Sequence, residues 1–326
     1  MENLADSTQS TKLYALLLKL RPLERGTLMP FSGELVHGAW LNWLRDVAPD
    51  VASQLHEGNK RRLFTCSSLQ FPHAKEHILK AERENIHLPL EPQKTYTVRL
   101  TLLHGDLFPL LYTTIMGKNE LTTHTNPHPF LQIGKQSFLL EEVVSHADDP
   151  SGWTGFTTCE SLVENARRKR FLLSQPLELE FSSITAFNRM RNFNKPYGNH
   201  FARLPQPSYV FGGLANRWQE IAPPALRHMV QYKRIQEYIE TEGLVIDDYQ
   251  LHTHNVHYAQ CSQPGFVGTC RYILRGPDEP STADEPLTAR QQILLLSWLA
   301  FYTGVGYKPT MGMGQTRLLE EDKRGR

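Results

Sequence analysis

The segment Tyr302–Gly314 reads YTGVGYKPTMGMG and directly follows Ala289–Tyr302, a strongly apolar stretch with the length of a helix. It holds two GxG pairs with a lysine between them: Gly304, Gly306, Lys308, Gly312 and Gly314. Glycine tolerates positive φ and close approach to a ligand, and the N–H groups of such a loop can hold phosphate oxygens. From the residues alone, the alternative is a tight connection that closes a sheet. The segment matches neither GxxxxGK[ST] nor GxGxxG after a strand, so it does not indicate a nucleotide-binding loop.

Around this segment, apolar periodicity predicts two α+β halves and no run of βαβ units. Asp148–Gly152 (DDPSG) is the predicted linker, which gives domains of residues 1–148 and 149–326. Ser32 is the expected N-cap of the first helix. The predicted strands are Lys12–Leu20, Tyr96–Leu103, two runs within Phe130–Val143, Leu177–Phe181, Ser183–Phe187, Val256–Tyr258 and Thr269–Leu274. The predicted helices are Ser32–Val47, Val51–His56, Arg217–Thr241 and Ala289–Tyr302.

Composition sets broad limits on the class of protein. The chain has 326 residues, 40% hydrophobic and 21% charged, which is an ordinary soluble mixture with room for two domains. Because 35 Lys and Arg balance 34 Asp and Glu, net charge does not indicate a nucleic-acid partner, and any basic surface must be gathered on one face. The N-terminal residues lack the layout of a signal peptide, and no apolar run near them can span a bilayer. We therefore expect a cytoplasmic protein with no membrane partner.

Cysteine and histidine patterns predict neither a metal site nor a cofactor. The four cysteines contain no CxxC pair, and buried cytosolic thiols are the simpler interpretation. His252, His254 and His257 have spacing that resembles a zinc motif. On a strand, however, His252 and His254 share one face while His257 points away, and no neighbouring Cys or carboxylate completes a tetrahedral set.

Several blocks share their order with one known family. The segment TGVGYKPTMGMGQ after an apolar helix resembles the C-terminal glycine-rich loop of the CRISPR repeat-RNA-processing endoribonucleases, family six of the CRISPR-associated proteins in the RAMP superfamily. LPQPSYVFGGLANRW (Leu204–Trp218) and HTHNVHYAQCSQPGFVGTCRYIL (His252–Leu274) resemble the blocks that precede that loop. VAPDVASQLHEGNKRRLFTCSSL (Val47–Leu69) resembles the N-terminal block of the family.

This resemblance implies two tandem ferredoxin-like (RRM-like) domains, the first with the catalytic residues and the second with an RNA-binding glycine-rich loop. The implied activity is metal-independent cleavage of CRISPR repeat RNA in precursor transcripts. In such cleavage the 2′-hydroxyl attacks the adjacent phosphate and leaves a 5′-hydroxyl and a 2′,3′-cyclic phosphate. The implied partner is CRISPR repeat RNA, together with other subunits of a CRISPR effector complex where one forms.

The chemistry needs a base for the 2′-hydroxyl, an acid for the 5′-oxygen and a cation for the phosphorane charge. The resemblance places the catalytic histidine at His56 and a supporting basic residue at Arg62. Some relatives carry a tyrosine fifteen residues before that histidine, where this chain has Leu41. His37, about one turn before Leu41, is the candidate for the missing acid or base, and packing or capping is its alternative role.

Further basic residues are candidate RNA contacts, each with a solvated-surface alternative. Arg191 lies among aromatic residues, a mixture that suits base stacking or a core beneath a basic surface. The candidates outside the glycine-rich segment are Lys60, Arg61, Arg167, Arg168, Lys169, Arg170 and Arg191.

Two other classes of protein compete with a nuclease. RAMP proteins share the glycine-rich loop without cutting RNA, so a non-catalytic RNA-binding subunit of a CRISPR effector complex is the first alternative. The pair Leu55–His56, with the basic cluster Lys60–Arg62 that follows it, favours the nuclease. An enzyme that binds a nucleotide at the GxG pairs is the second alternative, and the absence of a nucleotide-loop motif argues against it.

Overall fold

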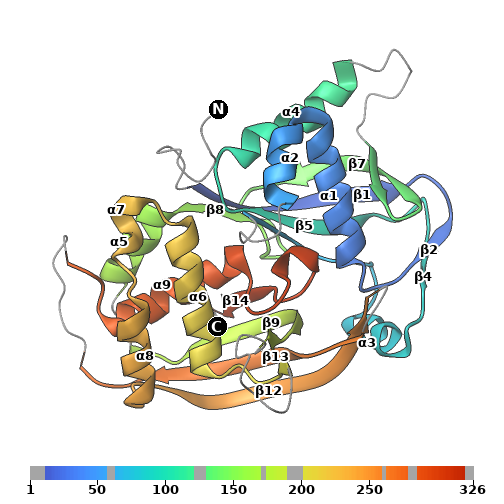
Figure 1. Cartoon of the computed structure of the whole chain (residues 1–326). Helices are drawn as coiled ribbons and strands as arrows, with labels where there is room; N and C mark the ends of the chain where they lie inside the picture. Colours follow the sequence, from blue (N-terminus) through green and yellow to red (C-terminus); the bar gives the residue numbers. More distant parts are fainter. Residues whose placement is uncertain are drawn as a thin grey trace, which may run out of the picture. The chain divides into compact units, whose positions relative to one another are not determined.

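The computed structural model describes residues 12–56, 63–120, 130–169, 174–188, 201–258, 262–277 and 285–319. The chain forms two compact units. The first comprises Met1–Phe156, Asn255–Gln263 and Thr310–Gly312, and the second comprises Thr157–His254, Pro264–Pro309 and Met313–Arg326. Both units combine helices with an antiparallel sheet (Figure 1), which confirms the α+β class. The domain boundary after residue 148 stays a prediction.

The sheet of the first unit is built around β1 (Lys12–Pro22), the apolar stretch near the N-terminus. β1 pairs antiparallel with β5 (Tyr96–Leu102) on one side and with β7 (Gln136–Val144) on the other. β3 (Phe64–Cys66) pairs with β5, and β6 (Phe130–Ile133) pairs with β7. The short β8, Gly155–Thr158, also pairs with β1.

The helices of the first unit complete a ferredoxin-like order. α1 (Gly33–Val47) connects β1 to β3, and α4 (Leu107–Glu120) follows β5. The chain order β1-α1-β3-β5-α4-β7, with spatial order β3-β5-β1-β7, is that of a βαββαβ unit. The remaining elements of this unit are α2 (Pro49–His56), α3 (Lys75–Glu84), β2 (Gly26–Leu28) and β4 (Leu88–Leu90).

Alternation along β1 gives the sheet two different faces. Leu16, Leu18 and Leu20 are buried in one hydrophobic cluster with Trp40 and Leu44 of α1. Full burial of one such side chain contributes about 1.5–3 kcal/mol relative to exposure, so this face holds the helices on the sheet. The apolar run, which was predicted to be a strand because Pro22 follows it, forms the centre of this core.

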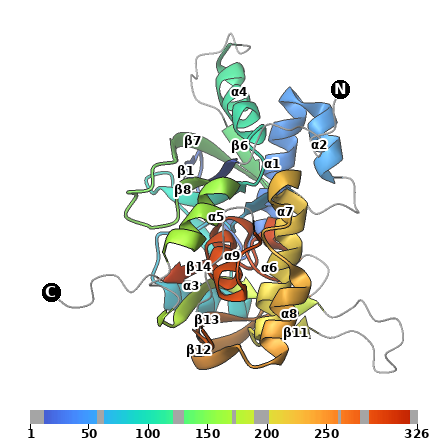
Figure 2. The ribbon, with the colours of Figure 1, turned by 90° about the vertical axis from the view of Figure 1, so that its left-hand side faces the viewer.

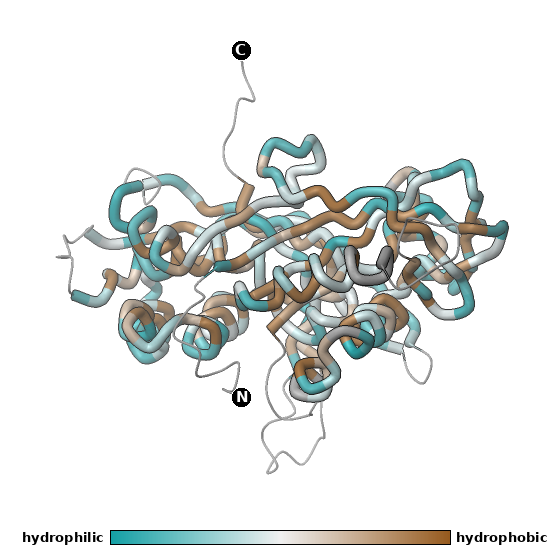
Figure 3. The backbone as a smooth tube through the Cα atoms, turned by 90° about the horizontal axis from the view of Figure 1, so that it is seen from above, coloured by the Kyte–Doolittle hydropathy of each residue, from teal (hydrophilic) through white to brown (hydrophobic). Residues whose placement is uncertain are grey.

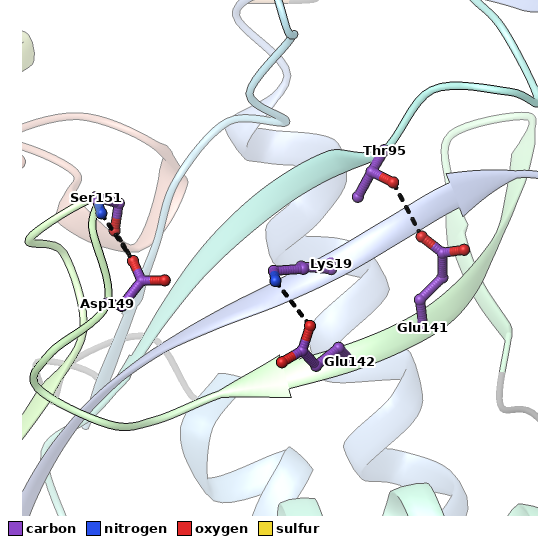
Figure 4. A network of polar contacts seen from close by, with 6 residues as sticks. All are labelled: Lys19, Thr95, Glu141, Glu142, Asp149 and Ser151. Carbon is purple, nitrogen blue, oxygen red and sulfur yellow. Dashed lines mark hydrogen bonds and ion pairs between the residues drawn. The ribbon is translucent and has the colours of Figure 1, made fainter.

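The opposite face of this sheet carries charged side chains at the end of β1 and on β7. Figure 4 shows Lys19 of β1 reaching Glu142 of β7 at 2.7 Å, while the Thr95 hydroxyl donates to Glu141 at 3.1 Å. The hydrogen bond to Glu142 raises the pKa of the Lys19 ammonium group. Exposed pairs of this kind contribute little to stability.

The second unit repeats the same order around β9 (Leu177–Thr185). β9 pairs antiparallel with β13 (Ser262–Leu274) and with β14 (Thr316–Leu319), and β12 (Leu244–His257) lies beyond β13. The spatial order β12-β13-β9-β14 is again that of a ferredoxin-like sheet. A separate two-stranded sheet joins β10 (Phe187–Asn188) to β11 (Phe201–Ala202).

Helices α5, α6, α8 and α9 of the second unit lie on the same side of its sheet (Figures 1 and 2): Cys159–Arg168, Pro207–Ile221, Tyr232–Glu240 and Ala289–Thr303. α9 packs on β9 and β14 and is buried along nearly its whole length. Its first turn has a capping box between Thr288 and Gln291.

Hydrophobic stretches follow the inner strands and helices in Figure 3, with hydrophilic ones in the outer turns. Among the described residues, no helix has the length and apolar character needed to cross a membrane.

The helix predicted at Arg217–Thr241 is wrong in extent. The chain forms α6, then the short α7 (Pro224–Arg227), then α8. Pro207 starts α6 because proline suits the first helical turn, and the Pro223–Pro224 pair ends it because proline cannot continue a helix. The strand predicted at Val256–Tyr258 is likewise only the end of the long strand β12.

Candidate functional site

The first part of the glycine-rich segment closes on itself and on β9 within the second unit. Val305 N–H donates to the Gly314 carbonyl at 2.8 Å, and Gly314 N–H donates to the Ile184 carbonyl at 2.9 Å. Tyr307 N–H donates to the Ala186 carbonyl at 2.8 Å. These bonds bring the end of α9 and the start of β14 together beside β9. The segment therefore forms a tight connection that closes the sheet.

Packing explains why glycine occupies these positions. Gly304, Gly306 and Gly314 have φ of 64°, 84° and 71°, a region that other residues rarely adopt. A Cβ at Gly306 would lie 2.5 Å from the Ala186 carbonyl oxygen, and one at Gly314 would overlap the Val305 oxygen. The Gly314 amide is already bonded to protein, so contact between these glycines and RNA stays a prediction.

Lys308 is the cation of this segment, and it has two aromatic neighbours. Its Nζ lies 5.4 Å from the centre of the Tyr307 ring, which in turn lies 5.2 Å from the Phe201 ring. All three residues are partly exposed. A cation beside two accessible rings suits a nucleic-acid strand, because rings stack on bases and cations attract phosphate.

Thr310–Gly312, a later part of the same glycine-rich segment, belongs to the first unit. Gly312 N–H donates to the Cys66 carbonyl of β3 at 3.1 Å. His37 Nδ1 lies 2.8 Å from the Thr310 carbonyl oxygen, and the Cys66 thiol donates to the same oxygen at 2.9 Å. The structure thus brings together His37 and part of the glycine-rich segment, which were predicted separately.

His37 is buried within the first unit. It is 6% exposed, and its ring stacks on Phe64 with the centroids 5.3 Å apart and the planes at 24°. Since a carbonyl oxygen can only accept, the contact with Thr310 requires the proton of the neutral ring to be on Nδ1. The contact therefore defines the tautomer of the neutral ring.

His56 is the last residue of α2, which packs beside α1 in the first unit (Figure 1). Its side chain and residues 57–62, which include Lys60, Arg61 and Arg62, lie outside the described part of the structure. Leu41, at the position where some relatives carry tyrosine, is 4% exposed in the core. These observations leave the predicted roles of His56 and Arg62 untested.

The basic cluster after the linker lies at the end of α5 in the second unit. Arg167 donates to the Glu285 carbonyl at 2.6 Å, Arg168 pairs with Glu164, and Lys169 lies 5.5 Å from the Trp298 ring. Arg170 and Arg191 are outside the described residues. RNA contact by this cluster stays a prediction, with Arg168 the most exposed of the three described members.

Thiols and metal ligands offer no second centre in the described part of the chain. Burial raises the pKa of Cys159 to about 12 and that of Cys270 to about 11, so both thiols are protonated at neutral pH. His252, His254 and His257 all lie on β12. No group of three or more His, Cys, Asp or Glu side chains is arranged to hold a metal ion among the described residues.

The contacts of Thr310 and Cys66 with the predicted site could not be foreseen from the sequence. The bond that Thr310 makes to His37 uses a backbone carbonyl, which every residue has, and it joins positions 273 residues apart. Cys66 lies in the block Val47–Leu69 that resembles the family, but its role as a thiol donor depends on the same long-range contact. No local pattern could have indicated either one.

Two ferredoxin-like units, with a glycine-rich segment after the last helix of the second, define a RAMP-type protein. The N-terminal domain model of the CRISPR-associated endoribonuclease Cas6 matches residues 13–164, and the main Cas6 model matches residues 179–316. The chain belongs to the Cas6 family of CRISPR-associated endoribonucleases.

Solved Cas6 structures share this architecture. A Cas6 product complex is 25% identical, covers 94% of this chain and 100% of its own, and has a TM-score of 0.69. Thermus thermophilus Cas6 is 22% identical, covers 95% of this chain and 99% of its own, and has a TM-score of 0.62. No curated protein sequence gives a match.

Proposed function

We propose that this chain binds CRISPR repeat RNA and cuts it without a metal ion, to release mature guide RNAs from precursor transcripts. Membership of the Cas6 family supports an endoribonuclease of CRISPR RNA processing. The observation that carries the proposal is the likeness over both units to a Cas6 product complex, at 94% coverage and a TM-score of 0.69. RNA is therefore the proposed partner, through Lys308 and the neighbouring rings.

The proposed reaction uses the 2′-hydroxyl of the RNA as nucleophile. His56 acts as general acid or base, and Arg62 stabilises the charge that develops on the phosphorane oxygens. The products are a 5′-hydroxyl and a 2′,3′-cyclic phosphate. The role of His37 as a second acid or base stays a prediction, and its contacts support a different role, that of a positioning residue.

Cleavage of cognate repeat RNA is expected to proceed at an unchanged rate in excess EDTA, because the RNA supplies the nucleophile and side chains supply the proton transfers. The measurement is a single-turnover time course with and without chelator, in parallel with a magnesium-dependent ribonuclease that must lose activity. Cleavage that appears only after a divalent metal is added would contradict the proposed reaction.

Replacing Lys308 with glycine should separate RNA binding from folding. Lys308 has φ of 49°, so glycine should relieve about 1–2 kcal/mol of backbone strain while removing the cation. We expect weaker RNA binding, with the slope of log affinity against log salt reduced by roughly 0.7 for one lost phosphate contact.

The matched control is Glu242→Gly. Glu242 lies in the same unit with φ of 58° and is exposed, so glycine gives the same relief of strain without removing a cation. Fluorescence anisotropy at several salt concentrations measures both affinities. A Lys308→Gly protein with the affinity and salt slope of the control would show that Lys308 does not contact RNA.

A further inference from the structure

Thr310–Gly312 fits against the start of α1 and the end of β3 with almost no space between the backbones. A Cβ at Gly33 would overlap the carbonyl of Met311. A Cβ at Gly312 would lie 2.9 Å from Ser68 Oγ and 3.1 Å from the Cα of Gly33. The two glycines therefore face each other and permit an approach that any larger residue would prevent.

Ser32 and Ser68 fix the surface on which this segment lies. Ser32 precedes α1 at the N-cap position, but its hydroxyl does not cap the helix. It accepts instead from Leu69 N–H at 3.0 Å, while Ser32 N–H donates to Ser68 Oγ at 3.1 Å. These reciprocal bonds join the start of α1 to the chain after β3, so both sides of the contact surface are held in place.

His37 is one helical turn after Gly33, on the same face of α1. Its Nδ1–H donates to the Thr310 carbonyl at 2.8 Å, and stacking on Phe64 of β3 fixes the plane of the ring. The thiol of Cys66, also in β3, donates to the same carbonyl. One carbonyl of the glycine-rich segment is thus held from both α1 and β3.

We propose that His37 is a positioning residue that fastens Thr310–Gly312 to the first unit. Lys308 lies two residues before Thr310 in the chain, so we expect loss of the fastening to weaken RNA binding by this segment. The effect on RNA rests on the proposed function, whereas the fastening itself does not. A proton-transfer role would need the titrating imidazole, but fastening needs only a donor at the place of Nδ1.

Asparagine and alanine at position 37 distinguish these roles, because the asparagine amide can donate from nearly the place of Nδ1 and does not titrate near neutral pH. Gly312 N–H, bonded to the Cys66 carbonyl, reports on the fastening. With glycine-selective ¹⁵N labelling of the full chain, His37→Ala should make this amide exchange roughly tenfold faster, as expected for losing about one hydrogen bond. His37→Asn should restore most of the protection.

Gly314 is the internal reference for this measurement. Its amide donates to Ile184 in the second unit, so its exchange should be the same in all three proteins. Unchanged exchange of Gly312 in a folded His37→Ala protein would overturn the fastening, whatever the protein does to RNA.

Cleavage of repeat RNA gives the second result. His37→Ala should bind RNA more weakly and cleave it more slowly at subsaturating enzyme, and His37→Asn should recover most of that loss. A contrary outcome is that His37→Asn protects Gly312 yet cleaves as slowly as His37→Ala at saturating enzyme. The imidazole of His37 would then transfer a proton, and positioning would be overturned as the reason why His37 affects cleavage. If no variant of the chain cuts RNA, the proposed function fails while the Gly312 result still stands.

The contact can also be broken from the other side, with residue 37 intact. Gly33→Ala should displace Met311 and speed Gly312 exchange, since its Cβ would overlap the Met311 carbonyl. Gly38→Ala is the matched control in the same helix, because a Cβ there meets nothing within 4 Å. Equal Gly312 exchange in the two variants would refute the proposed contact surface.

Discussion

A His56→Ala protein is expected to lose cleavage by about 10²–10⁴-fold, the usual effect of removing one general acid or base, while it keeps most of its affinity for repeat RNA. The two effects separate because binding is spread over many phosphate contacts, whereas proton transfer depends on a single positioned group. Single-turnover cleavage at saturating enzyme measures the rate, and anisotropy on uncleavable RNA measures the affinity.

Two controls limit the interpretation of that result. His87→Ala removes another histidine of the first unit, one that is exposed and whose ring Nδ1 lies 3.4 Å from the Thr27 hydroxyl, and it should cleave normally. A 2′-deoxy substitution just 5′ of the scissile phosphate should stop cleavage by the wild-type protein and leave binding intact, because it removes the nucleophile.

Full single-turnover activity in a folded His56→Ala protein would place the active site elsewhere. Absence of cleavage by the wild-type protein, with tight binding of repeat RNA, would instead favour the non-catalytic RNA-binding subunit. These two outcomes differ in the wild-type measurement and so cannot be confused.

The sequence predicted well those elements whose pattern of polar and apolar residues matches their burial in the structure. β1 and β5 were located to within two residues, because their side chains alternate between core and surface or run continuously through the core. The strands β6 and β7 were placed around Gly134, which has φ of 60° and makes the turn between them. Local periodicity and turn chemistry are sufficient at such positions.

Helices α3, α4 and α5 were missed. α4 is apolar on several sides, so it lacks the one-sided stripe that marks a surface helix, whereas α3 and α5 have such a stripe but are polar on average. The basic residues at 167–170 were considered as a solvated loop, but Arg167 and Arg168 form the last turn of α5, where cations favour the negative end of the helix dipole.

The catalytic residues of the candidate site were proposed only because a resemblance supplied them, and their roles stay predictions. Gly304–Gly314 attracted attention as a possible phosphate loop, whereas the structure shows that the backbone of Gly314 closes a sheet and that of Gly312 meets β3. The choice between those interpretations depends on β9 and β3, which are far away in sequence. No pattern local to the segment contains that information.

Gly314→Ala is expected to lower the free energy of unfolding of the second unit by about 3–5 kcal/mol, a large part of the stability of an ordinary domain. Three costs combine. The φ of 71° is unfavourable for alanine, the new Cβ would overlap the Val305 carbonyl, and relief of that overlap would weaken two backbone hydrogen bonds, to Val305 and to Ile184. Urea denaturation followed by fluorescence measures the change.

Gly276→Ala separates strain from close packing. Gly276 is in the same unit with φ of 89°, but a Cβ there meets nothing within 4 Å. This control should cost only the backbone strain, about 1–2 kcal/mol. Equal destabilisation by the two variants would mean that the residues around Gly314 accommodate the new Cβ with no further loss of stability. A much larger effect at Gly314 would mean that replacing a glycine of this segment damages the fold, so weak RNA binding by such a variant would not report on RNA contact. The RNA role of this segment therefore has to be tested at Lys308.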